Sequence, residues 1–466
     1  MFSVLNVINK VVWGIPLMVM ILVVGIYLCK KTGFAQITLF PEALCRFFKQ
    51  FKKEKNNGNR TSPYRALCTA LAATVGTGNL AGVAGAICIG GPGTVFWMWV
   101  AAFLGMVTKF AEAALAICFQ AKNAAGELVG GPMYMIEKGM GKQWKWLAYI
   151  YCFFGVVASF GVGNATQINT VVAGINKMVC GFGGEASPFV NLILGLVLGG
   201  LVLVILIGGA KRIGSLAERL VPFAAAVYLL IGVVVLIRNS SRIPQAFSDI
   251  FHGALDPRAF GGGVIGSVFL TIRTGTARGV FTNEAGMGTA AIAHATADVT
   301  HPVEQGLMGI IEVFLDTIVI CTVTALVILC SDAVIPYGTD VGAVLTMDAF
   351  VSVYGNWCNV LITGLLCCFA IATVIGWGLY GIRCAQYLFG DSVWKQFAVM
   401  QAVMAVVGAV LETNTVWLLA DIVNGLMAVP NLIALWYLTP TLSDMVKDYK
   451  KSLKKCQTLG SGAVSS

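Results

Sequence analysis

Long apolar stretches separated by short polar segments run through almost the whole chain. A helix needs about 20 mostly apolar residues to cross about 30 Å of hydrocarbon. Eleven segments meet or approach this length, and the pattern therefore predicts an all-α membrane protein with about eleven transmembrane helices in one bundle. The predicted spans are 12–29, 66–90, 94–119, 145–179, 190–210, 216–237, 262–292, 306–332, 357–388, 394–411 and 415–437.

The first apolar segment resembles the core of a signal peptide, because the basic residue Lys10 precedes it. No cleavage site with small residues follows, and Lys30 and Lys31 stand at its end as in a stop-transfer sequence. We therefore expect this segment to remain as a membrane helix.

The ten later segments divide into two sets of five. The first member of each set contains a glycine-rich polar interruption in mid-span, at 74–79 and at 275–286. Interrupted helices at matching places in two halves are typical of transporters and point to the binding site. Because five is an odd number, the two repeats should have inverted topology. The repeat rests on this spacing, since the halves share no obvious residue identity.

The expected organisation follows from these segments. It comprises an extra N-terminal helix (1–31), a basic cytoplasmic linker (32–65), a first five-helix repeat (66–237), an external loop (238–261), a second five-helix repeat (262–437) and a cytoplasmic tail (438–466).

Lys and Arg predict the orientation, because cytoplasmic loops of membrane proteins are rich in both. The loop 30–65 holds nine of them, whereas the loops 180–189 and 333–356 hold none. With the N-terminus outside and the C-terminus in the cytoplasm, the remaining basic clusters also fall inside. These clusters are the loop 120–144, Lys211–Arg212, Lys395 and the tail.

Composition supports the membrane assignment and excludes several other classes. Only 11% of the 466 residues are charged, against about 25% in soluble domains, and the mean hydropathy is +0.82. The net charge of +9 does not favour nucleic-acid binding, because the basic residues lie between apolar spans. The 14 Cys residues lie mostly inside spans without CxxC spacing, and no metal or catalytic motif accompanies the three His residues. We expect no cofactor.

The interruption at 74–79 offers the groups that a zwitterionic amino acid and a cation require. Gly76 and Gly78 permit unusual torsions and close approach. Free carbonyl groups of an unwound helix can bind Na⁺, and free N–H groups can bind a carboxylate. Thr74, Thr77 and Asn79 add side-chain oxygen atoms. The structural alternative is that these glycines only allow tight helix packing.

The same stretch also matches a dinucleotide-binding fingerprint. Gly76 to Ala81 fits the pattern GxGxxA, which should follow a strand and precede an acidic residue about 20 positions on. The match lies inside an apolar span, and no Asp or Glu occurs between Thr77 and Phe110. The sequence therefore argues against a nucleotide site.

Ionisable residues inside apolar spans are costly, so they usually face the bundle interior and find partners. One interpretation is ion coupling or gating. The other is structural ion pairing, which is favoured for Lys109 with Glu112, three residues apart; for Arg278 and Glu284 both interpretations stay open. The residues concerned are Lys109, Glu112, Arg273, Arg278, Glu284, Glu312 and Asp316.

Polar and aromatic residues in other spans could complete a small site. Gln167 lies in the span 145–179, and Thr373 and Trp377 lie four residues apart on one face of the span 357–388. A hydroxyl can bind an ion or an amine, and an indole can close an apolar pocket. The structural alternative is a Thr bonded to its own i−4 carbonyl beside a core Trp.

Four sequence blocks show a family resemblance. Together they resemble the alanine or glycine:cation symporter family, also called the sodium:alanine symporters, over about residues 12–440. The departures are Thr94, in place of a small apolar residue, and Thr282 and Thr289, where Ser is common. The blocks are TVGTGNLAGV at 74–83, GPGTVFWMW at 91–99, GGPMY at 130–134 and FTNEAGMGT at 281–289.

The resemblance implies the inverted-repeat, leucine-transporter-like fold of the amino acid–polyamine–cation superfamily, with one extra N-terminal helix. It implies a Na⁺ site at Ala72, Val75 and Thr373. It also implies a substrate site. The substrate residues would be Thr77, Gly78, Asn79, Gln167, Phe281, Asn283, Thr373 and Trp377.

The expected function is sodium-coupled symport of a small neutral amino acid across the inner (cytoplasmic) membrane. The partners are the amino acid, Na⁺ (with H⁺ as the alternative coupling ion) and the lipid bilayer, without nucleic acid. A nutrient sensor is a second possibility, but it would usually carry a signalling domain, and only 26 residues follow Pro440. A membrane enzyme is a third, but no nucleophile–base or metal set supports it.

Overall fold

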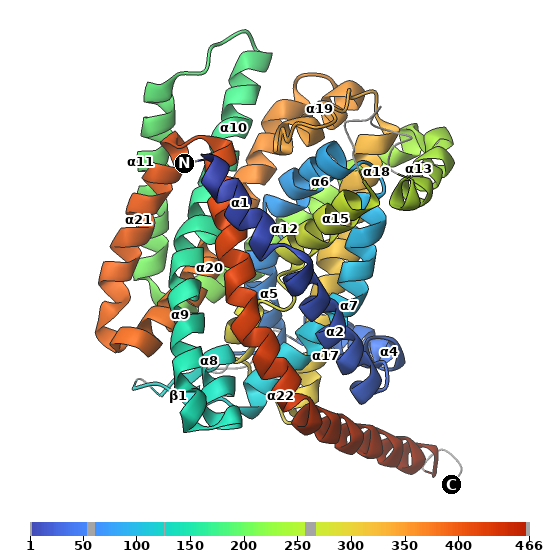
Figure 1. Cartoon of the computed structure of the whole chain (residues 1–466), viewed down its shortest axis with the longest axis vertical. Coiled ribbons are helices and arrows are strands. Elements are labelled where there is room, and N and C mark those ends of the chain that lie inside the picture. Colours follow the sequence, from blue (N-terminus) through green and yellow to red (C-terminus); the bar gives the residue numbers. More distant parts are fainter. Residues whose placement is uncertain (1, 54–60, 125, 257–266, 463–466) are drawn as a thin grey trace.

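The structure is a computed structural model that describes residues 2–53, 61–124, 126–256 and 267–462. Apart from one two-stranded hairpin and an isolated bridge between Thr61 and Ala297, its regular elements are helices. The hairpin pairs β1 (Ala121–Lys122) with antiparallel β2 (Leu128–Val129). The all-α prediction is confirmed (Figure 1).

The first half of the chain forms a series of long helices with short irregular turns between them. Its elements are α1 (Phe2–Val12), α2 (Ile15–Thr32), α3 (Ala35–Thr38), α4 (Phe40–Lys53), α5 (Pro63–Thr74), η1 (Gly78–Gly82), α6 (Val83–Gly90), α7 (Thr94–Cys118), α8 (Pro132–Tyr134), η2 (Met135–Met140), η3 (Lys142–Trp144), α9 (Lys145–Phe160), η4 (Gly161–Ala165), α10 (Thr166–Gly181), α11 (Pro188–Ile207) and α12 (Gly209–Arg238).

The second half repeats this pattern. Its elements are η5 (Ser240–Arg242), α13 (Ile243–Leu255), α15 (Val268–Asn283), α16 (Thr289–His294), α17 (Pro302–Val313), η6 (Phe314–Cys321), α18 (Thr322–Cys330), α19 (Ala343–Tyr354), α20 (Cys358–Phe389), η7 (Asp391–Val393), α21 (Trp394–Val410) and α22 (Thr413–Gly462).

Nine helices in the described part of the chain are long and apolar enough to cross a membrane. A tenth span results when α5 and the helix after it, which meet at 50°, are counted together. The predicted span 262–292 instead holds two short helices, α15 and α16, and its residues 262–266 lie outside the described ranges. The count of eleven therefore stays a prediction.

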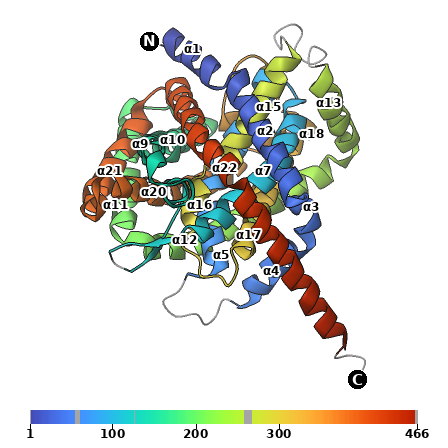
Figure 2. The same cartoon turned by 60° about the horizontal axis from the view of Figure 1, so that its bottom comes forward.

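The last span differs most from its predicted limits. Hydropathy falls after residue 437, but α22 continues to Gly462. Leu442, Val446 and Tyr449 remain buried, and the hydroxyl of Ser443 donates to the carbonyl of Lys31 at 2.9 Å. The helix persists because its extension packs against the end of α2 and its neighbours. Figure 2 shows its last turns projecting beyond the bundle.

The two ends of the bundle carry different elements. The hairpin, α4 and the extension of α22 lie at one end, which we call the tail end (Figure 1). The connection between α10 and α11, with α13 and α19, lies at the opposite end. The tail end is therefore the predicted cytoplasmic side.

Cysteine labelling tests this orientation. In a variant whose Cys456 and exposed Cys45, Cys118 and Cys180 are replaced by Ser, Glu185→Cys should react with a membrane-impermeant maleimide on intact cells. Lys451→Cys should react only after permeabilisation, because the basic tail is predicted to be cytoplasmic. The reverse labelling pattern would overturn the orientation.

Candidate functional site

The first break separates α5 from the π-helical turn η1. A continuing helix would pair the N–H of Gly76 with the carbonyl of Ala72. That N–H instead donates to Oδ1 of Asn79 at 2.9 Å. The amide of Asn79 in turn donates to Asp316 Oδ1 at 2.7 Å. Asn79 therefore fixes the unwound segment, and the last carbonyl groups of α5, Val75 included, meet no continuing helix.

Gln167 reaches this break from α10. Its Oε1 accepts from the hydroxyl of Thr77 at 2.8 Å and from the Thr77 N–H at 3.4 Å. Its own amide donates to the carbonyl of Val162 at 3.0 Å, within the π-helical turn η4. The two irregular segments are thus joined through one side chain.

Thr373 reaches the same break from α20. A Cβ added to Gly76 would overlap the Thr373 hydroxyl and would lie 3.4 Å from Oε1 of Gln167. Glycine is therefore required at position 76 for this approach. The first break, α10 and α20 converge at this point.

The hydroxyl of Thr373 is buried and has no hydrogen-bond partner among the residues that the structure describes. Thr hydroxyls in helices commonly bond to the i−4 carbonyl, as those of Thr166 and Thr170 do here. The hydroxyl of Thr373 makes no such bond to the i−4 carbonyl. The structural alternative, in which this hydroxyl is satisfied by its own helix, is therefore wrong for Thr373. A buried, unsatisfied oxygen beside the open end of α5 suits a cation that takes oxygen ligands.

The second break follows α15 and is stabilised by two carboxylic side chains. Glu284 adopts left-handed torsions, with φ at 55°. Oε1 of Glu112, on α7, accepts from the N–H groups of Gly286 at 2.9 Å and Gly288 at 3.1 Å. The amide of Asn431, on α22, donates to the same oxygen at 2.7 Å. Buried backbone donors of the unwound segment are thereby satisfied.

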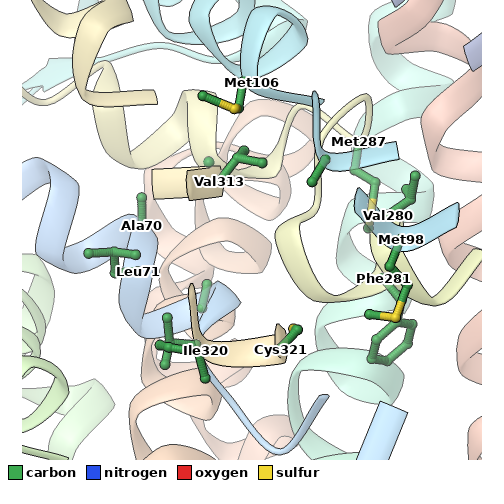
Figure 3. Packing of buried hydrophobic residues seen from close by; sticks show 14 of the residues in the cluster. Ala70, Leu71, Met98, Met106, Val280, Phe281, Met287, Val313, Ile320 and Cys321 are labelled. Atoms are coloured by element: carbon green, nitrogen blue, oxygen red, sulfur yellow. The ribbon is translucent and has the colours of Figure 1, made fainter. Parts of the chain in front are cut away.

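Phe281 connects the two breaks. A Cβ on Gly78 would lie 3.4 Å from Phe281 Cε1, so the ring lies directly over the first break. The Phe281 ring also meets the ring of Trp417 at 5.1 Å. Val280, Met287 and other buried apolar side chains fill the space around it (Figure 3).

Asn283 and Trp377 take positions that the sequence did not reveal. Asn283 accepts from the N–H of Ala285 at 2.9 Å and donates to the hydroxyl of Thr317 at 3.1 Å, which makes it a clamp of the second break. Trp377 donates from Nε1 to Oε1 of Glu284 at 2.6 Å. Each predicted residue thus lies at or beside one of the breaks, and their contact with a substrate stays a prediction.

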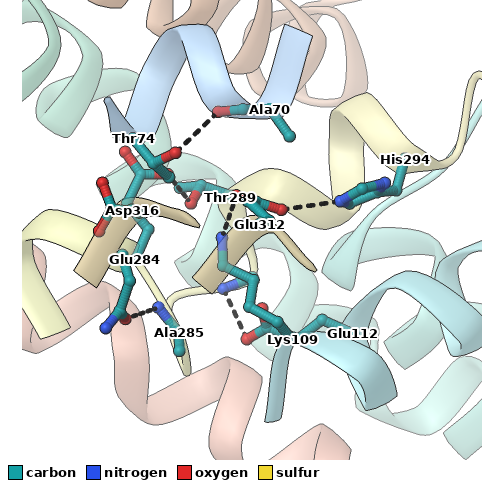
Figure 4. A network of polar contacts seen from close by, with 12 residues as sticks. Ala70, Thr74, Lys109, Glu112, Glu284, Ala285, Thr289, His294, Glu312 and Asp316 are labelled. Atoms are coloured by element: carbon teal, nitrogen blue, oxygen red, sulfur yellow. Dashed lines mark hydrogen bonds and ion pairs between the residues drawn. The ribbon is translucent and has the colours of Figure 1, made fainter. Parts of the chain in front are cut away.

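The buried charges form a network that differs from the predicted pairing. Lys109 pairs with Glu312 on α17, at 3.0 Å, and not with Glu112. The second oxygen of Glu312 contacts Nε2 of His294 at 2.8 Å (Figure 4). Lys109 and Glu112 diverge because Glu112 is engaged by the N–H groups of the second break, which the sequence could not show.

Arg278 precedes Phe281 by three residues on α15. Its guanidinium pairs with Asp421 at 3.2 Å and approaches Asp340 at 3.7 Å. It also lies over the rings of Phe281 and Trp417, at 5.8 and 5.3 Å. Beyond it opens a cavity of about 160 Å³. Arg278 therefore lines this cavity and also contacts Phe281, the ring that lies over the first break.

Several of these partners were missed from the sequence. His294, Gln305, Trp417, Asp421 and Asn431 all contribute to the site or to its supports. The available signal was that each is a polar or aromatic residue in or next to an apolar span. Nothing in the sequence indicates which of them lie near the breaks.

Comparisons with known proteins agree with this architecture. The sodium/alanine symporter AgcS of Methanococcus maripaludis is 41% identical over 456 residues, covering 97% of this chain and 98% of that protein. The probable sodium/glutamine symporter GlnT of Bacillus subtilis is 36% identical over 454 residues, covering 97% and 91%.

A solved structure shows the same fold. MhsT in complex with L-phenylalanine superposes with a TM-score of 0.59 at 13% identity, covering 84% of this chain and 99% of that protein. The leucine-transporter-like fold that the family resemblance implies is thereby confirmed. The model of the sodium:alanine symporter family matches residues 1–460. A match across nearly the whole length, together with the two broken helices, shows that the chain belongs to the sodium:alanine symporter family of multi-pass amino acid transporters.

Proposed function

We propose that the chain imports a small neutral amino acid, alanine or glycine, together with Na⁺ by alternating access across the cytoplasmic membrane. The observation that carries this proposal is the buried, unpartnered hydroxyl of Thr373 facing Gly76 at the first break. Buried polar side chains are usually hydrogen-bonded, and among the unpaired buried oxygens of the described residues that of Thr373 is the one that faces Gly76 at the first break. Reversible binding of a cation would give the Thr373 hydroxyl the partner that it otherwise lacks within the described residues.

The Na⁺ would be held by neutral oxygens. Ala72 lies in the last turn of α5, and Val75 follows the helix next to Gly76, which approaches Thr373. Three neutral ligands leave the positive charge of the ion uncompensated, so the membrane potential acts on it. This contributes about 2.3 kcal/mol per charge per 100 mV. One coupled Na⁺ therefore suffices to concentrate a zwitterion that carries no net charge.

The amino acid would lie along the first break. The segment from Thr77 to Asn79 offers the start of a helical turn to a carboxylate. Gln167 already contacts Thr77 there and can bind a polar head group. Phe281 lies against Gly78 and leaves little room for a side chain. These features favour a substrate with a short apolar side chain.

Ion-gradient uptake tests the coupling. Proteoliposomes of the purified protein should accumulate labelled alanine when an inward Na⁺ gradient is imposed. A pH gradient in choline buffer should give no accumulation. Accumulation driven equally by the pH gradient without Na⁺ would show proton coupling, and absence of uptake under every gradient would refute transport of alanine.

Competition for alanine uptake tests the size of the site. Unlabelled glycine, alanine and serine should compete, because their side chains fit beside Phe281. Leucine should compete at least about tenfold less well, since overpacking costs about 1–3 kcal/mol. Glutamate should fail because a charged side chain would be buried without a partner. Strong competition by glutamine would assign this chain the specificity named for the Bacillus subtilis relative.

A further inference from the structure

Glu284 adopts a backbone conformation that its residue type does not favour. Its φ is 55°, and among the described residues only Phe34 is another non-glycine with positive φ. The later positive-φ positions of the same break, 286 and 288, are both glycine. Left-handed torsions at other residues store strain that the surroundings must hold in place. The side chain of Glu284 therefore has a role that a glycine could not fill.

That role is visible in the contacts of its carboxylate. Oε1 accepts from the indole Nε1 of Trp377 at 2.6 Å, and Oε2 accepts from the hydroxyl of Thr289 at 2.5 Å. Both oxygens are satisfied, and Glu284 forms no ion pair within the described residues. Hydrogen bonds to a carboxylate are among the stronger ones. The second break is thus tied to α20 through the Trp377 ring.

The other end of Trp377 is equally fixed. A Cβ on Gly163 would overlap the Cβ and Cγ atoms of Trp377, so the π-helical turn η4 must present a glycine there. The indole also meets the ring of Tyr380 edge-on at 5.8 Å. Trp377 stands one turn after Thr373 on α20 and is buried. The bond to Glu284 and the close approach of Gly163 therefore hold the side chain at both ends.

We propose that Glu284 is a positioning residue that sets the size selectivity of the substrate site by holding the Trp377 ring. This ring lies on the same face of α20 as Thr373, one turn away from the first break. This inference rests on the proposed function. Without the carboxylate, the indole N–H would be buried without an acceptor, which disfavours the observed ring orientation. The ring would then move to another rotamer, and the site would admit larger neutral side chains.

A double-mutant cycle tests the proposal through selectivity. The measured quantity is the inhibition constant of leucine divided by that of alanine. Both constants come from binding experiments on the purified protein. Glu284→Ala and Trp377→Phe, which removes the indole N–H together with part of the ring, should each lower the ratio about tenfold, the equivalent of about 1.4 kcal/mol. The double variant should lower it no further, because both changes remove one interaction.

Two controls separate positioning from general damage. Glu284→Gln should keep the wild-type ratio, because its amide oxygen can still accept from the indole. Tyr228→Phe removes a different buried hydrogen bond, the 2.7 Å contact of Tyr228 with Thr324, and should also keep it. An unchanged ratio in Glu284→Ala, or additive effects in the double variant, would overturn the proposal.

The contact itself can be followed without any substrate. Nuclear magnetic resonance spectra of protein labelled with ¹⁵N-tryptophan show the indole N–H signals. The signal that is present in the wild type and absent from Trp377→Phe belongs to Trp377. It should shift in Glu284→Ala and stay near its original place in Glu284→Gln. An unmoved resonance in Glu284→Ala would refute the contact. If wild-type protein bound neither alanine nor glycine, the proposed function would fail, while this spectrum would still decide whether Glu284 holds the ring.

Discussion

Thr373→Ala raises the Na⁺ concentration required for half-maximal alanine uptake by about tenfold or more, equal to at least about 1.4 kcal/mol of ion binding. The substitution removes one neutral oxygen ligand and puts nothing in its place. Because the Thr373 hydroxyl forms no hydrogen bond within the described part of the chain, the fold should be little affected. Uptake at saturating Na⁺ should therefore remain measurable.

Two variants make this result specific. Thr373→Ser retains the hydroxyl and should keep a Na⁺ dependence close to that of the wild type. Thr363→Ala changes a buried Thr on the same helix, whose hydroxyl donates to the carbonyl of Gly174 at 3.3 Å, and should leave the Na⁺ dependence unchanged. Intact uptake with unaltered Na⁺ dependence in Thr373→Ala would remove Thr373 from the ion site.

Lys109→Met destabilises the protein by about 3–5 kcal/mol, the range measured when one partner of a buried ion pair is removed. Lys109 and Glu312 lie 3.0 Å apart, and both side chains are fully buried. Methionine fills similar space but leaves the Glu312 carboxylate with His294 as its remaining partner. Heating with a thiol-reactive dye measures the effect, because buried Cys68 and Cys152 become reactive on unfolding.

Two further variants make the stability measurement of Lys109→Met specific: a double variant that should restore stability, and a variant of a partly exposed ion pair. Lys109→Met combined with Glu312→Gln removes both charges and should recover much of the lost stability. Lys177→Met breaks a partly exposed pair with Asp348, 2.7 Å apart, and should cost no more than about 1 kcal/mol. An unfolding transition of Lys109→Met equal to that of the wild type would contradict the structural role of this pair.

The sequence located the elements of this fold because hydropathy responds directly to the membrane. The predicted span 94–119 and the observed α7 (Thr94–Cys118) differ by one residue. Both breaks were also found, since glycine and polar residues stand out within apolar runs. The continuation of α22 past residue 437 was missed because its turns as far as Tyr449 are held by packing and not by lipid.

The site was predictable in its residues but not in its pairing. Thr77, Gln167 and Thr373 were chosen as polar groups in apolar spans, and the fold brings them together. Glu312 as the partner of Lys109, 203 positions away, follows only from how α7 packs on α17. Side chains at such separations meet through tertiary packing, which a single sequence does not encode locally.

The extension of α22 has a practical consequence for imaging this protein. Most of the chain lies within the helical bundle, which offers electron cryomicroscopy few external features for particle alignment. Residues 451–462 continue the last helix outward for about 18 Å at 1.5 Å per residue. A helical fusion partner joined in register to this rod would inherit its direction. It would serve as a rigid fiducial outside the detergent micelle, on the face away from α13 and α19.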